Sequence, residues 1–506
     1  MDTEIELKFL LSDNEVPLIP GLLMQFAKTV NNKPTKQLQN AYFDTPERTL
    51  RQFDIGLRTR CCNDECEQTI KLAGEVVGGL HQRPEYNLPI SGGRPSIQDF
   101  DASIWPAGFD VADIAARLQP IFSTNFTRRK WLVETDQGSV IEVVLDKGEI
   151  TTGKQSEPIS ELEIELVEGD REDIFAFAEH LIGQLGVRLG LYSKAARGYR
   201  LADGKPLTAS HALGFVPLER SATQEEALIA VVGYAIRFVQ KHEQCYFDEP
   251  KLKTLKRLLD GIALIRHSFW LFDEIVDKSS TEAIRKELKW LIAELSWVEN
   301  AIQLRTYSSK RHAYYKKINN APELAQVIND LQDVQPSITD MQDLFHCSRY
   351  NRLLLSLTRW LVDKSWRKSW NQKAVMAADK PVLEVAGQLF NRDWQEMREL
   401  MRADKSFTAQ DYLQLKPHLE STMQNGNCLG ALFDKEARRA FRTPWIDIVY
   451  GVYELQTLAY LKQLCHSQGD EQLEEIQAWL DQKSGFLVSA MEQSRIASLD
   501  NQPYWR

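Results

Sequence analysis

Alternating charged residues near the N-terminus are the first candidates for chemistry. Glu4, Glu6 and Lys8 alternate with apolar residues between positions 3 and 9. In an extended strand the two sets point to opposite faces, so the three charged residues share one side. Two carboxylates suit a hard divalent cation, and a neighbouring Lys suits a phosphate oxygen bridged to that cation. An isolated pattern of this kind also fits the solvated face of an amphipathic strand, so the surrounding chain must decide.

Charged residues share strand faces repeatedly along the first 200 residues. The groups are Arg58 and Arg60, Thr69 and Lys71, Arg83 and Glu85, Arg128 and Lys130, Glu142 and Asp146, and Glu161, Glu163 and Glu165. One side of each strand must pack against something, so solvent exposure does not explain so many charged faces. A closed barrel with a charged interior accommodates them all. Buried charge this dense requires partners, and a short phosphate chain that chelates magnesium matches both the carboxylates and the cations.

The elements that must position these residues can be predicted from the hydrophobic pattern. Short alternating runs separated by Gly, Pro, Asn and Asp predict strands over 54–60, 68–72, 140–145 and 162–167. Wider apolar spacing predicts helices over 17–29, 110–118 and 172–185. The first part of the chain is therefore predicted to be α+β with a dominant antiparallel sheet.

The pattern changes after residue 200. Glycine becomes rare, and apolar residues fall at helical spacing, as at Leu288, Leu291, Ile292 and Leu295. The segment 201–218 is rich in Gly and Pro and reads as a linker. We therefore predict an N-terminal domain over 1–200, a linker over 201–218 and an all-α helical bundle over 219–506.

Composition excludes several classes of protein. The 506 residues are 43% hydrophobic and 26% charged, as in ordinary soluble proteins, and no apolar run is long enough for a membrane helix. No secretory signal is readable, so we expect a cytoplasmic protein with no membrane partner. Nearly all of the net charge of -10 falls in the first 218 residues, which argues against nucleic acid as a partner. The charge pattern says nothing about the oligomeric state.

The seven cysteines are an odd number scattered through a long chain, which predicts reduced thiols. Cys61, Cys62 and Cys66 lie close together, but no second ligand pair follows at zinc-finger spacing. We therefore expect no structural zinc there. His81 is the one His near the charged strands, and we interpret it as an exposed turn residue that does not act as a base.

Several motifs follow one another in this part of the chain: E-x-E-x-K at Glu4 to Lys8, L-R-x-R at Leu57 to Arg60, T-I-K ending at Lys71, Asp146 with Gly148, L-E-I-E at Leu162 to Glu165, and Ser193 with Lys194. Together these motifs resemble the CYTH family of triphosphate tunnel metalloenzymes. They occur in the family's order and cover essentially the first 200 residues. The resemblance implies an eight-stranded antiparallel β tunnel that hydrolyses or cyclises triphosphates with a divalent metal, Mg²⁺ or Mn²⁺.

The resemblance also implies roles for residues. The metal ligands would be Glu4, Glu6, Asp146, Glu163 and Glu165. The substrate-binding residues would be Lys8, Arg58, Arg60, Lys71, Arg83, Arg129 and Lys194. The catalytic set would be Glu4, Glu6, Lys8, Arg58, Arg60, Lys71, Glu85, Arg129 and Lys194. Strand parity leaves open which of Arg128, Arg129 and Lys130 faces the tunnel, and we choose Arg129 because the family tends to place an Arg near that position.

The helical part contains an H-x-x-R pattern at His346 and Arg349. This pattern, after a domain of the kind described above, resembles the CHAD family, in which histidines and basic residues line a polyphosphate-binding surface. The first helical unit departs from that pattern, because Glu243 follows His242 where an Arg-rich helix is expected. The resemblance implies that longer polyphosphate is a potential ligand of this half.

The leading functional prediction is hydrolysis of inorganic triphosphate to diphosphate and phosphate by metal-activated water that attacks the terminal phosphorus. A thiamine triphosphatase and a class IV adenylyl cyclase are alternatives in the same tunnel. A cyclase must also hold a base, for which the sequence offers no identifiable region. A polyphosphate-binding scaffold without catalysis is the alternative from another class, and the intact set of charged residues argues against it.

Overall fold

The computed structural model describes residues 2–62, 65–205, 211–466 and 473–505, and the side chains of residues 2–4 and 62 lie outside that description. The chain forms two compact units that do not follow its linear order. The barrel unit comprises Met1–Ala209, Glu243–Asp248 and Met341–Asp363. The helical unit comprises Ser210–His242, Glu249–Asp340 and Lys364–Arg506. Two short segments from the helical part of the sequence thus belong to the barrel unit.

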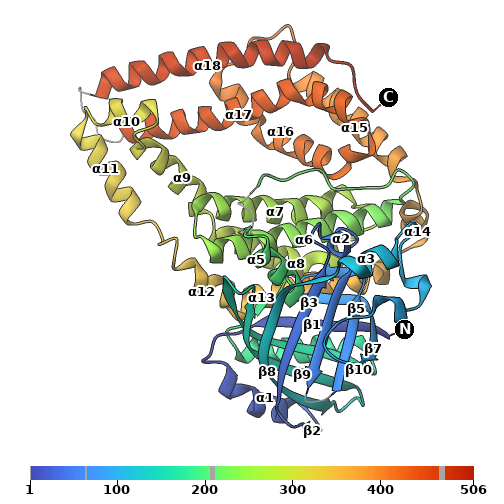
Figure 1. The fold of residues 1–506 in the computed structure, drawn as a ribbon. Helices are drawn as coiled ribbons and strands as arrows, with labels where there is room; N and C mark the ends of the chain where they lie inside the picture. The colour runs from blue at the N-terminus through green and yellow to red at the C-terminus, as the bar shows by residue number, and fades with distance from the viewer. Residues whose placement is uncertain (1, 63–64, 206–210, 467–472, 506) are drawn as a thin grey trace. The chain divides into compact units, whose positions relative to one another are not determined.

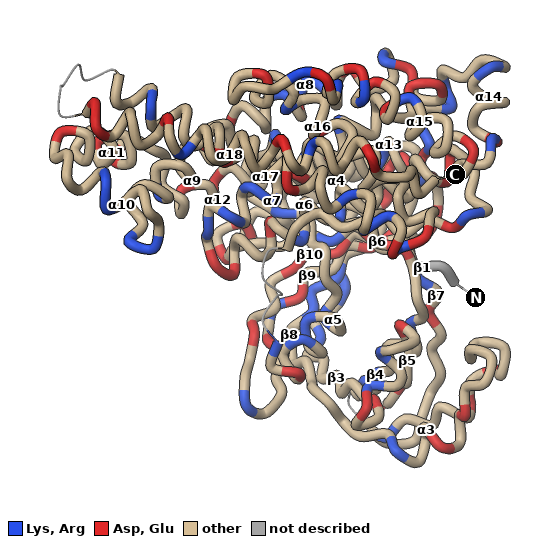
Figure 2. The backbone as a smooth tube through the Cα atoms, turned by 90° about the horizontal axis from the view of Figure 1, so that it is seen from above, with Lys and Arg blue, Asp and Glu red and all other residues tan. Residues whose placement is uncertain are grey.

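Eight antiparallel strands close into a ring in the barrel unit, in the order β1, β10, β9, β8, β3, β4, β5, β7 and back to β1. Their bounds are β1 Asp2–Leu10, β3 Lys36–Asp44, β4 Gly56–Cys62, β5 Glu65–Lys71, β7 Leu80–Ile90, β8 Gln119–Glu134, β9 Val140–Thr151 and β10 Ser156–Glu168. Three short strands, β2 (Thr29–Asn32), β6 (Glu75–Val77) and β11 (Arg188–Leu189), extend β8, β7 and β1. Figure 2 looks into this ring. The predicted eight-stranded antiparallel barrel is therefore confirmed.

The alternating pattern of β1 is explained by two different surroundings. On one side, Leu7 and Phe9 are fully buried. On the other side Lys8 lies opposite Glu163 of β10, and Glu6 lies opposite Glu165. Because the side chains of a strand alternate, the apolar set packs on the outside of the barrel while the charged set lines the inside. The β1 pattern is thus one wall of a charged interior.

Helices of the barrel unit cover the outside of the sheet and one part of its inside. They are α1 Ile19–Phe26, α2 Thr49–Gln52, α3 Val111–Arg117, α4 Arg171–Gln184, α5 Lys194–Ala202, α12 Met341–His346 and α13 Ser348–Val362, with 3₁₀ turns η1 Val16–Leu18, η2 Ile97–Asp99 and η3 Ala102–Ile104. Phe26 of α1 stacks on Phe177 of α4, which joins two of the outer helices. In Figure 2, α5 lies against β8, β9 and β10.

Helix α13 is bound to the barrel by polar contacts. Asn351 accepts a hydrogen bond from the backbone N–H of Leu189 in β11 at 3.3 Å. Arg359 forms an ion pair with Glu172 of α4. These contacts explain why this stretch of the sequence belongs to the barrel unit.

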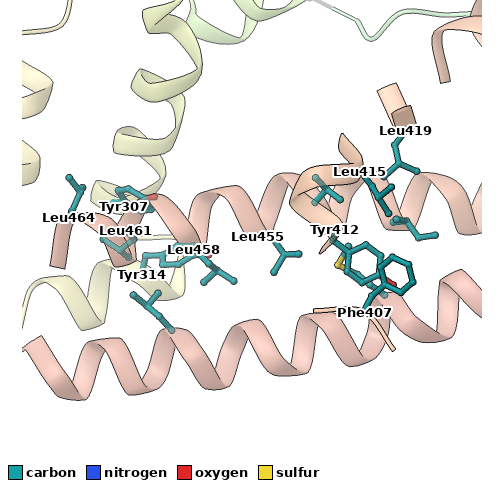
Figure 3. Packing of buried hydrophobic residues seen from close by; sticks show 14 of the residues in the cluster. Tyr307, Tyr314, Phe407, Tyr412, Leu415, Leu419, Leu455, Leu458, Leu461 and Leu464 are labelled. Atoms are coloured by element: carbon teal, nitrogen blue, oxygen red, sulfur yellow. The ribbon is translucent and has the colours of Figure 1, made fainter. Parts of the chain in front are cut away.

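The helical unit is α-helical, as predicted. Its helices are α6 Gln224–Asp248, whose last residues belong to the barrel unit, α7 Leu252–Leu271, α8 Lys278–Glu294, α9 Trp297–Ser308, α10 Ala313–Ile318, α11 Pro322–Asp333, α14 Gln372–Ala378, α15 Val382–Leu400, α16 Ala409–Leu429, α17 Lys435–His466 and α18 Glu474–Asp500, with 3₁₀ turns η4 Ser365–Ser369 and η5 Gly430–Leu432. Figure 1 shows α17 and α18 running side by side. Their shared core includes Tyr412, Leu455 and Leu458 (Figure 3). None of the helices among the described residues is long and apolar enough to span a membrane.

The prediction of reduced thiols is wrong for one pair of cysteines. Cys61 of β4 and Cys66 of β5 lie directly opposite each other in the sheet and form a disulfide. The hairpin register brings their Cα atoms to 4.2 Å, a proximity that spacing along the chain does not reveal. Cys245, Cys347, Cys428 and Cys465 are free thiols.

Candidate active site

A buried group of carboxylates forms one wall of the barrel interior. Asp146 of β9 and Glu161 and Glu163 of β10 each offer an oxygen atom within 4.8 Å of the other two. Asp146 and Glu161 are fully buried, and Glu163 is 8% exposed. Carboxylate oxygens are hard donors of the kind that Mg²⁺ and Mn²⁺ prefer. This donor set therefore fits a divalent cation of the type implied by the sequence.

Lys8, Arg128 and Lys194 lie against these carboxylates, and Arg197 also pairs with Glu161, at 3.5 Å. Lys8 forms ion pairs with Glu161 at 3.2 Å and with Glu163. Arg128 donates two hydrogen bonds to Asp146, at 2.7 and 2.6 Å. The same guanidinium lies 3.3 Å from Glu163. The two parallel bonds of Arg128 hold Asp146 in a defined orientation.

The third cation, Lys194, is placed by helix α5. Its ammonium lies 2.7 Å from Asp146 and 3.0 Å from Glu163, and it also pairs with Glu161. The helix begins here because Ser193 caps it by accepting a hydrogen bond from the N–H of Ala196. Close approach of α5 to the sheet depends on Gly198, since a Cβ at that position would lie 2.0 Å from the Phe122 ring. The local sequence thus fixes Lys194 over the carboxylates.

Mutual attraction keeps this cluster ionised. Burial alone would raise the pKa of the Glu163 carboxyl, but Lys194, Lys8 and Arg128 hold that pKa well below its usual range. Burial likewise opposes ionisation of Asp146, and Lys194 and Arg128 lower its pKa. Burial disfavours the charged form of Lys8, yet Glu161 and Glu163 raise its pKa to about 12. Asp146 and Glu163 are therefore deprotonated and able to act as ligands at neutral pH.

The opposite wall carries a second set of charges. Glu85 of β7 lies 2.8 Å from Lys71 of β5 and 3.6 Å from Arg58 of β4. Burial opposes ionisation of Glu85, but Lys71 and Arg58 lower its pKa to about 2. This carboxylate consequently stays negative and orients two cations that belong to different strands.

Arg60 extends this wall toward β8. Its Nε donates to Asn40 Oδ1 of β3 at 2.8 Å, and the amide of Asn40 donates to Thr124 of β8 at 2.8 Å. Burial and repulsion from Arg58 and Arg128 lower the pKa of Arg60. Three guanidinium groups thus repel one another within the interior, and a bound polyanion would relieve their repulsion.

The remaining predicted residues lie on the strands expected for them. Glu6 and Glu165 are cross-strand neighbours on β1 and β10, beside Lys8 and Glu163. Arg83 of β7 lies opposite Glu4 in the register, and its Nε is buried. Glu4 belongs to β1, but its side chain lies outside the described residues.

The choice of Arg129 as the residue facing the interior is wrong. Arg129 points to the other face of β8, where its guanidinium lies 4.9 Å from the centre of the Trp131 ring. Arg128 occupies the interior face and contacts Asp146 and Glu163. The register supplies the reason, because Arg128 is directly opposite Asp146 and Arg129 is opposite Leu145. Lys130, on the same face as Arg128, pairs with Glu142.

The expectation of an exposed His81 is also wrong. This residue lies inside β7, is 3% exposed, and contacts the carbonyl of Gly190 at 3.1 Å. Burial and the nearby charge of Lys8 lower its pKa to about 3, so it is neutral at physiological pH.

Glu161 was missing from the predicted metal ligands although it shares a strand face with Glu163. That shared face was the signal that could have included it.

Several basic residues of the helical part pair with protein groups or are buried among them. Lys256 pairs with Asp260 at 3.0 Å and with Glu299 at 3.1 Å. Arg438 and Arg442 are both buried. His346, expected to be part of a basic surface, is half-buried and contacts the carbonyl of Gln342 at 2.9 Å.

Comparison with known proteins identifies the family. Residues 2–199 match the CYTH domain model, and residues 230–472 match the CHAD domain model. An inorganic triphosphatase of Haemophilus influenzae is 37% identical over 248 residues, which are 49% of this chain and 67% of that protein. The chain belongs to the CYTH family and carries a CHAD domain.

Two solved structures are similar to parts of this CYTH protein. A Hippeastrum protein with a dominant triphosphatase activity is 21% identical and covers 41% of this chain and 99% of its own, with a TM-score of 0.30. The CHAD domain of the plant Ricinus communis is 16% identical and covers 58% of this chain and 98% of its own, with a TM-score of 0.44. The carboxylate cluster and the crowded arginines described above lie within the CYTH match.

Proposed function

We propose that the CYTH barrel hydrolyses inorganic triphosphate to diphosphate and phosphate with the help of a divalent metal ion. The observation that carries this proposal is the combination of buried carboxylates and a group of arginines inside one barrel. Buried carboxylates that can hold a metal lie on β9 and β10, while Arg58, Arg60 and Arg128 crowd together on β4 and β8. A short chain of phosphates that chelates a metal ion satisfies both groups at once. The inorganic triphosphatase of Haemophilus influenzae supports the choice of substrate.

The barrel wall that carries Arg58, Arg60 and Lys71 would bind the phosphate chain. Arg58 and Lys71 are oriented by Glu85 and are ready to contact phosphate oxygens. Repulsion within the arginine group falls when the polyanion binds, so part of the binding free energy comes from that relief. Negative charge shifts toward the bridging oxygen as its bond to the terminal phosphorus breaks, and positioned guanidinium groups stabilise that charge.

The carboxylate wall would prepare the nucleophile. Asp146 and Glu163 are ionised and held rigidly by Arg128 and Lys194, so they can accept hydrogen bonds from a water molecule and fix its direction. The water oxygen forms the new bond to the terminal phosphorus while the bond from that phosphorus to the bridging oxygen breaks. Diphosphate leaves with the bridging oxygen, one water proton stays on the new phosphate, and the other is released to solvent. A divalent ion bound by carboxylates among Glu4, Glu6, Asp146, Glu161, Glu163 and Glu165 would supply charge neutralisation and a more acidic water.

A substrate panel tests the proposal. Phosphate release from tripolyphosphate, thiamine triphosphate and ATP is measured with Mg²⁺ or Mn²⁺, and cyclic AMP is assayed in the ATP reaction. We expect the largest kcat/KM with tripolyphosphate and no cyclic AMP. A larger kcat/KM with thiamine triphosphate, or formation of cyclic AMP, would replace the proposed substrate by one of the alternatives. Absence of turnover with all three substrates would favour a polyphosphate-binding scaffold without catalysis. Binding of longer polyphosphate by the CHAD domain stays a separate prediction.

A further inference from the structure

Two stretches of the helical sequence that belong to the barrel unit both contact strand β11. They are Glu243–Asp248, the end of α6, and Met341–Asp363, which contains α13. Both stretches lie within the residues that match the CHAD model, whereas β11 lies within those that match the CYTH model. Strand β11 pairs with β1, the strand that carries Lys8. The CHAD part of the sequence therefore contacts a direct neighbour of a strand that lines the barrel interior.

Asn351 of α13 holds the backbone of β11. Its side chain is fully buried and accepts a hydrogen bond from the N–H of Leu189 at 3.3 Å. The amide nitrogen of Asn351 donates to the carbonyls of Phe345 and Cys347, at 2.9 and 3.0 Å, which fixes the orientation of the amide group. Leu189 is itself buried, and a buried backbone N–H requires an acceptor. Asn351 supplies this acceptor from α13.

The side chain of Arg188 provides the second contact between β11 and the helical sequence. Its guanidinium donates to Glu243 at 3.1 Å and lies 3.4 Å from the centre of the Phe247 ring. The other carboxylate oxygen of Glu243 accepts a hydrogen bond from the hydroxyl of Tyr350 at 2.6 Å. Arg188, Glu243 and Tyr350 are all buried. Buried charged groups whose hydrogen bonds are made hold one another in a single arrangement, so β11 has a fixed position.

Gly190, the residue after β11, contacts Lys8 directly. Its N–H donates to the carbonyl of Lys8 at 2.8 Å. An added Cβ on Gly190 would lie 2.9 Å from Cγ and Cδ of Lys8, so the glycine backbone packs against the methylene groups of the lysine. The ammonium of the same side chain lies 3.2 Å from Glu161 and also pairs with Glu163. A displacement of β11 would therefore move the charged end of Lys8 relative to the carboxylate cluster.

Helix α13 also contacts the segment on the other side of Lys8. The N–H of Lys8 donates to the carbonyl of Gly79 at 3.1 Å. Gly78 has a φ of +57°, and an added Cβ there would lie 1.5 Å from Oγ1 of Thr358. The loop between β6 and β7 thus packs directly on α13. Asn351 and Thr358 are seven residues apart, about two helical turns, and share a face of the helix. This face contacts both segments that hydrogen-bond the backbone of Lys8.

We propose that Asn351 is a positioning residue for the barrel interior. Through Leu189 and Gly190 it holds Lys8 at the carboxylate cluster, and full activity of the barrel therefore requires this residue of the CHAD part of the chain. The inference rests on the proposed triphosphatase activity and assigns to α13 a role in turnover that needs no ligand of its own. Displacement of a group at a reaction centre by about 1 Å can lower the rate by about a hundredfold.

Steady-state phosphate release from tripolyphosphate with Mg²⁺ tests the proposal on the full chain. Asn351→Leu keeps the approximate size of the side chain and removes the acceptor for the Leu189 N–H. In the folded variant kcat/KM should fall by about tenfold or more. Asn351→Ser also removes this acceptor and is used if Asn351→Leu does not fold. Ser356→Ala is the matched control, because Ser356 is exposed on the same helix, and it should keep wild-type kcat/KM.

A double-mutant cycle with Lys8→Met separates positioning from stability, which is measured by urea unfolding of each variant. If Asn351 acts through Lys8, its substitution should change kcat/KM by less than about twofold in the Lys8→Met background, while its loss of stability persists there. Lys8→Gln is used if Lys8→Met does not fold.

Three results would overturn the inference. They are wild-type kcat/KM in a folded Asn351 variant, an undiminished loss of kcat/KM when Lys8 is also replaced, and failure of both Asn351 variants to fold, which would make Asn351 a structural residue. Absence of tripolyphosphate cleavage by the wild-type chain would instead overturn the proposed function.

Discussion

Two adjacent arginines on β8 provide a sharp test of the barrel interior. We compare Arg128→Met with Arg129→Met. The guanidinium of Arg128 makes two hydrogen bonds to the fully buried Asp146 and a third contact to Glu163. Arg129 instead stacks over Trp131 on the opposite face of the strand. The two substitutions remove the same atoms from neighbouring positions. Any difference in stability or activity between the two variants therefore comes from the face of the sheet on which each arginine lies.

The expected effects follow from these contacts. Removing one partner of a buried, hydrogen-bonded ion pair costs about 3–5 kcal/mol, because the remaining carboxylates lose their counter-ion. Loss of the stack between Arg129 and Trp131 costs about 0.5–1 kcal/mol. If Arg128 also stabilises charge on the phosphates, kcat/KM for tripolyphosphate should fall by about a thousandfold in Arg128→Met. Arg129→Met should retain activity within a few-fold of wild type.

The assays are urea unfolding monitored by circular dichroism and phosphate release from tripolyphosphate. Arg128→Lys keeps the positive charge but not the paired hydrogen bonds, so it serves if Arg128→Met does not fold. We expect Arg128→Lys to fold and to have much lower kcat/KM than wild type. A greater loss of stability and activity in Arg129→Met than in the Arg128 variants, or wild-type kcat/KM in a folded Arg128→Met protein, would refute the interior role of Arg128.

Three further predictions concern α5, His81 and the metal. Gly198→Ala should lower the free energy of unfolding by about 1–3 kcal/mol and should also lower kcat. The reason is that the new methyl group clashes with Phe122 and moves Lys194. Gly21→Ala is the control, because the space around Gly21 is open. The folded-state pKa of His81 is lowered to about 3, so its stabilising effect is complete above pH 6.5 and is lost toward pH 3. His81→Gln should therefore reduce the pH dependence of unfolding free energy in that range by about 1.4 kcal/mol per pH unit; an unchanged slope would contradict a buried neutral imidazole. Chelation with EDTA should abolish phosphate release, and Mg²⁺ or Mn²⁺ should restore it; full activity in EDTA would exclude a metal requirement.

The sequence was sufficient to predict the barrel because its strands have two different faces. Lys8 and Glu163 recur at the period of a strand, and that period alone places them on a common side with their neighbours. The apolar partners of the same strands are buried on the outside, so the two patterns reinforce each other. Hydrophobic spacing likewise predicted the helices that follow.

Relations between strands could not be predicted in the same way. Arg128, Arg129 and Lys130 are three consecutive cations, so the sequence does not show whether Arg129 or its two neighbours face the barrel interior. The pairing of Arg128 with Asp146 in the neighbouring strand decides the question. His81 is buried and contacts the carbonyl of Gly190, a residue from a distant part of the chain. The disulfide between Cys61 and Cys66 depends on register in the same way. The local pattern of a strand predicts which of its side chains share a face, whereas the pairing of strands determines which residues those side chains contact.

The most direct test of the central claim is ³¹P NMR of the full chain with tripolyphosphate and Mg²⁺, compared with Glu163→Gln. This substitution removes a carboxylate of the buried cluster while keeping the size of the side chain. If the buried carboxylates act in hydrolysis, wild type produces equal amounts of phosphate and diphosphate, and a folded Glu163→Gln protein produces neither at a comparable rate. Wild-type turnover by Glu163→Gln, or no cleavage of tripolyphosphate by the wild-type chain, would contradict this role in hydrolysis.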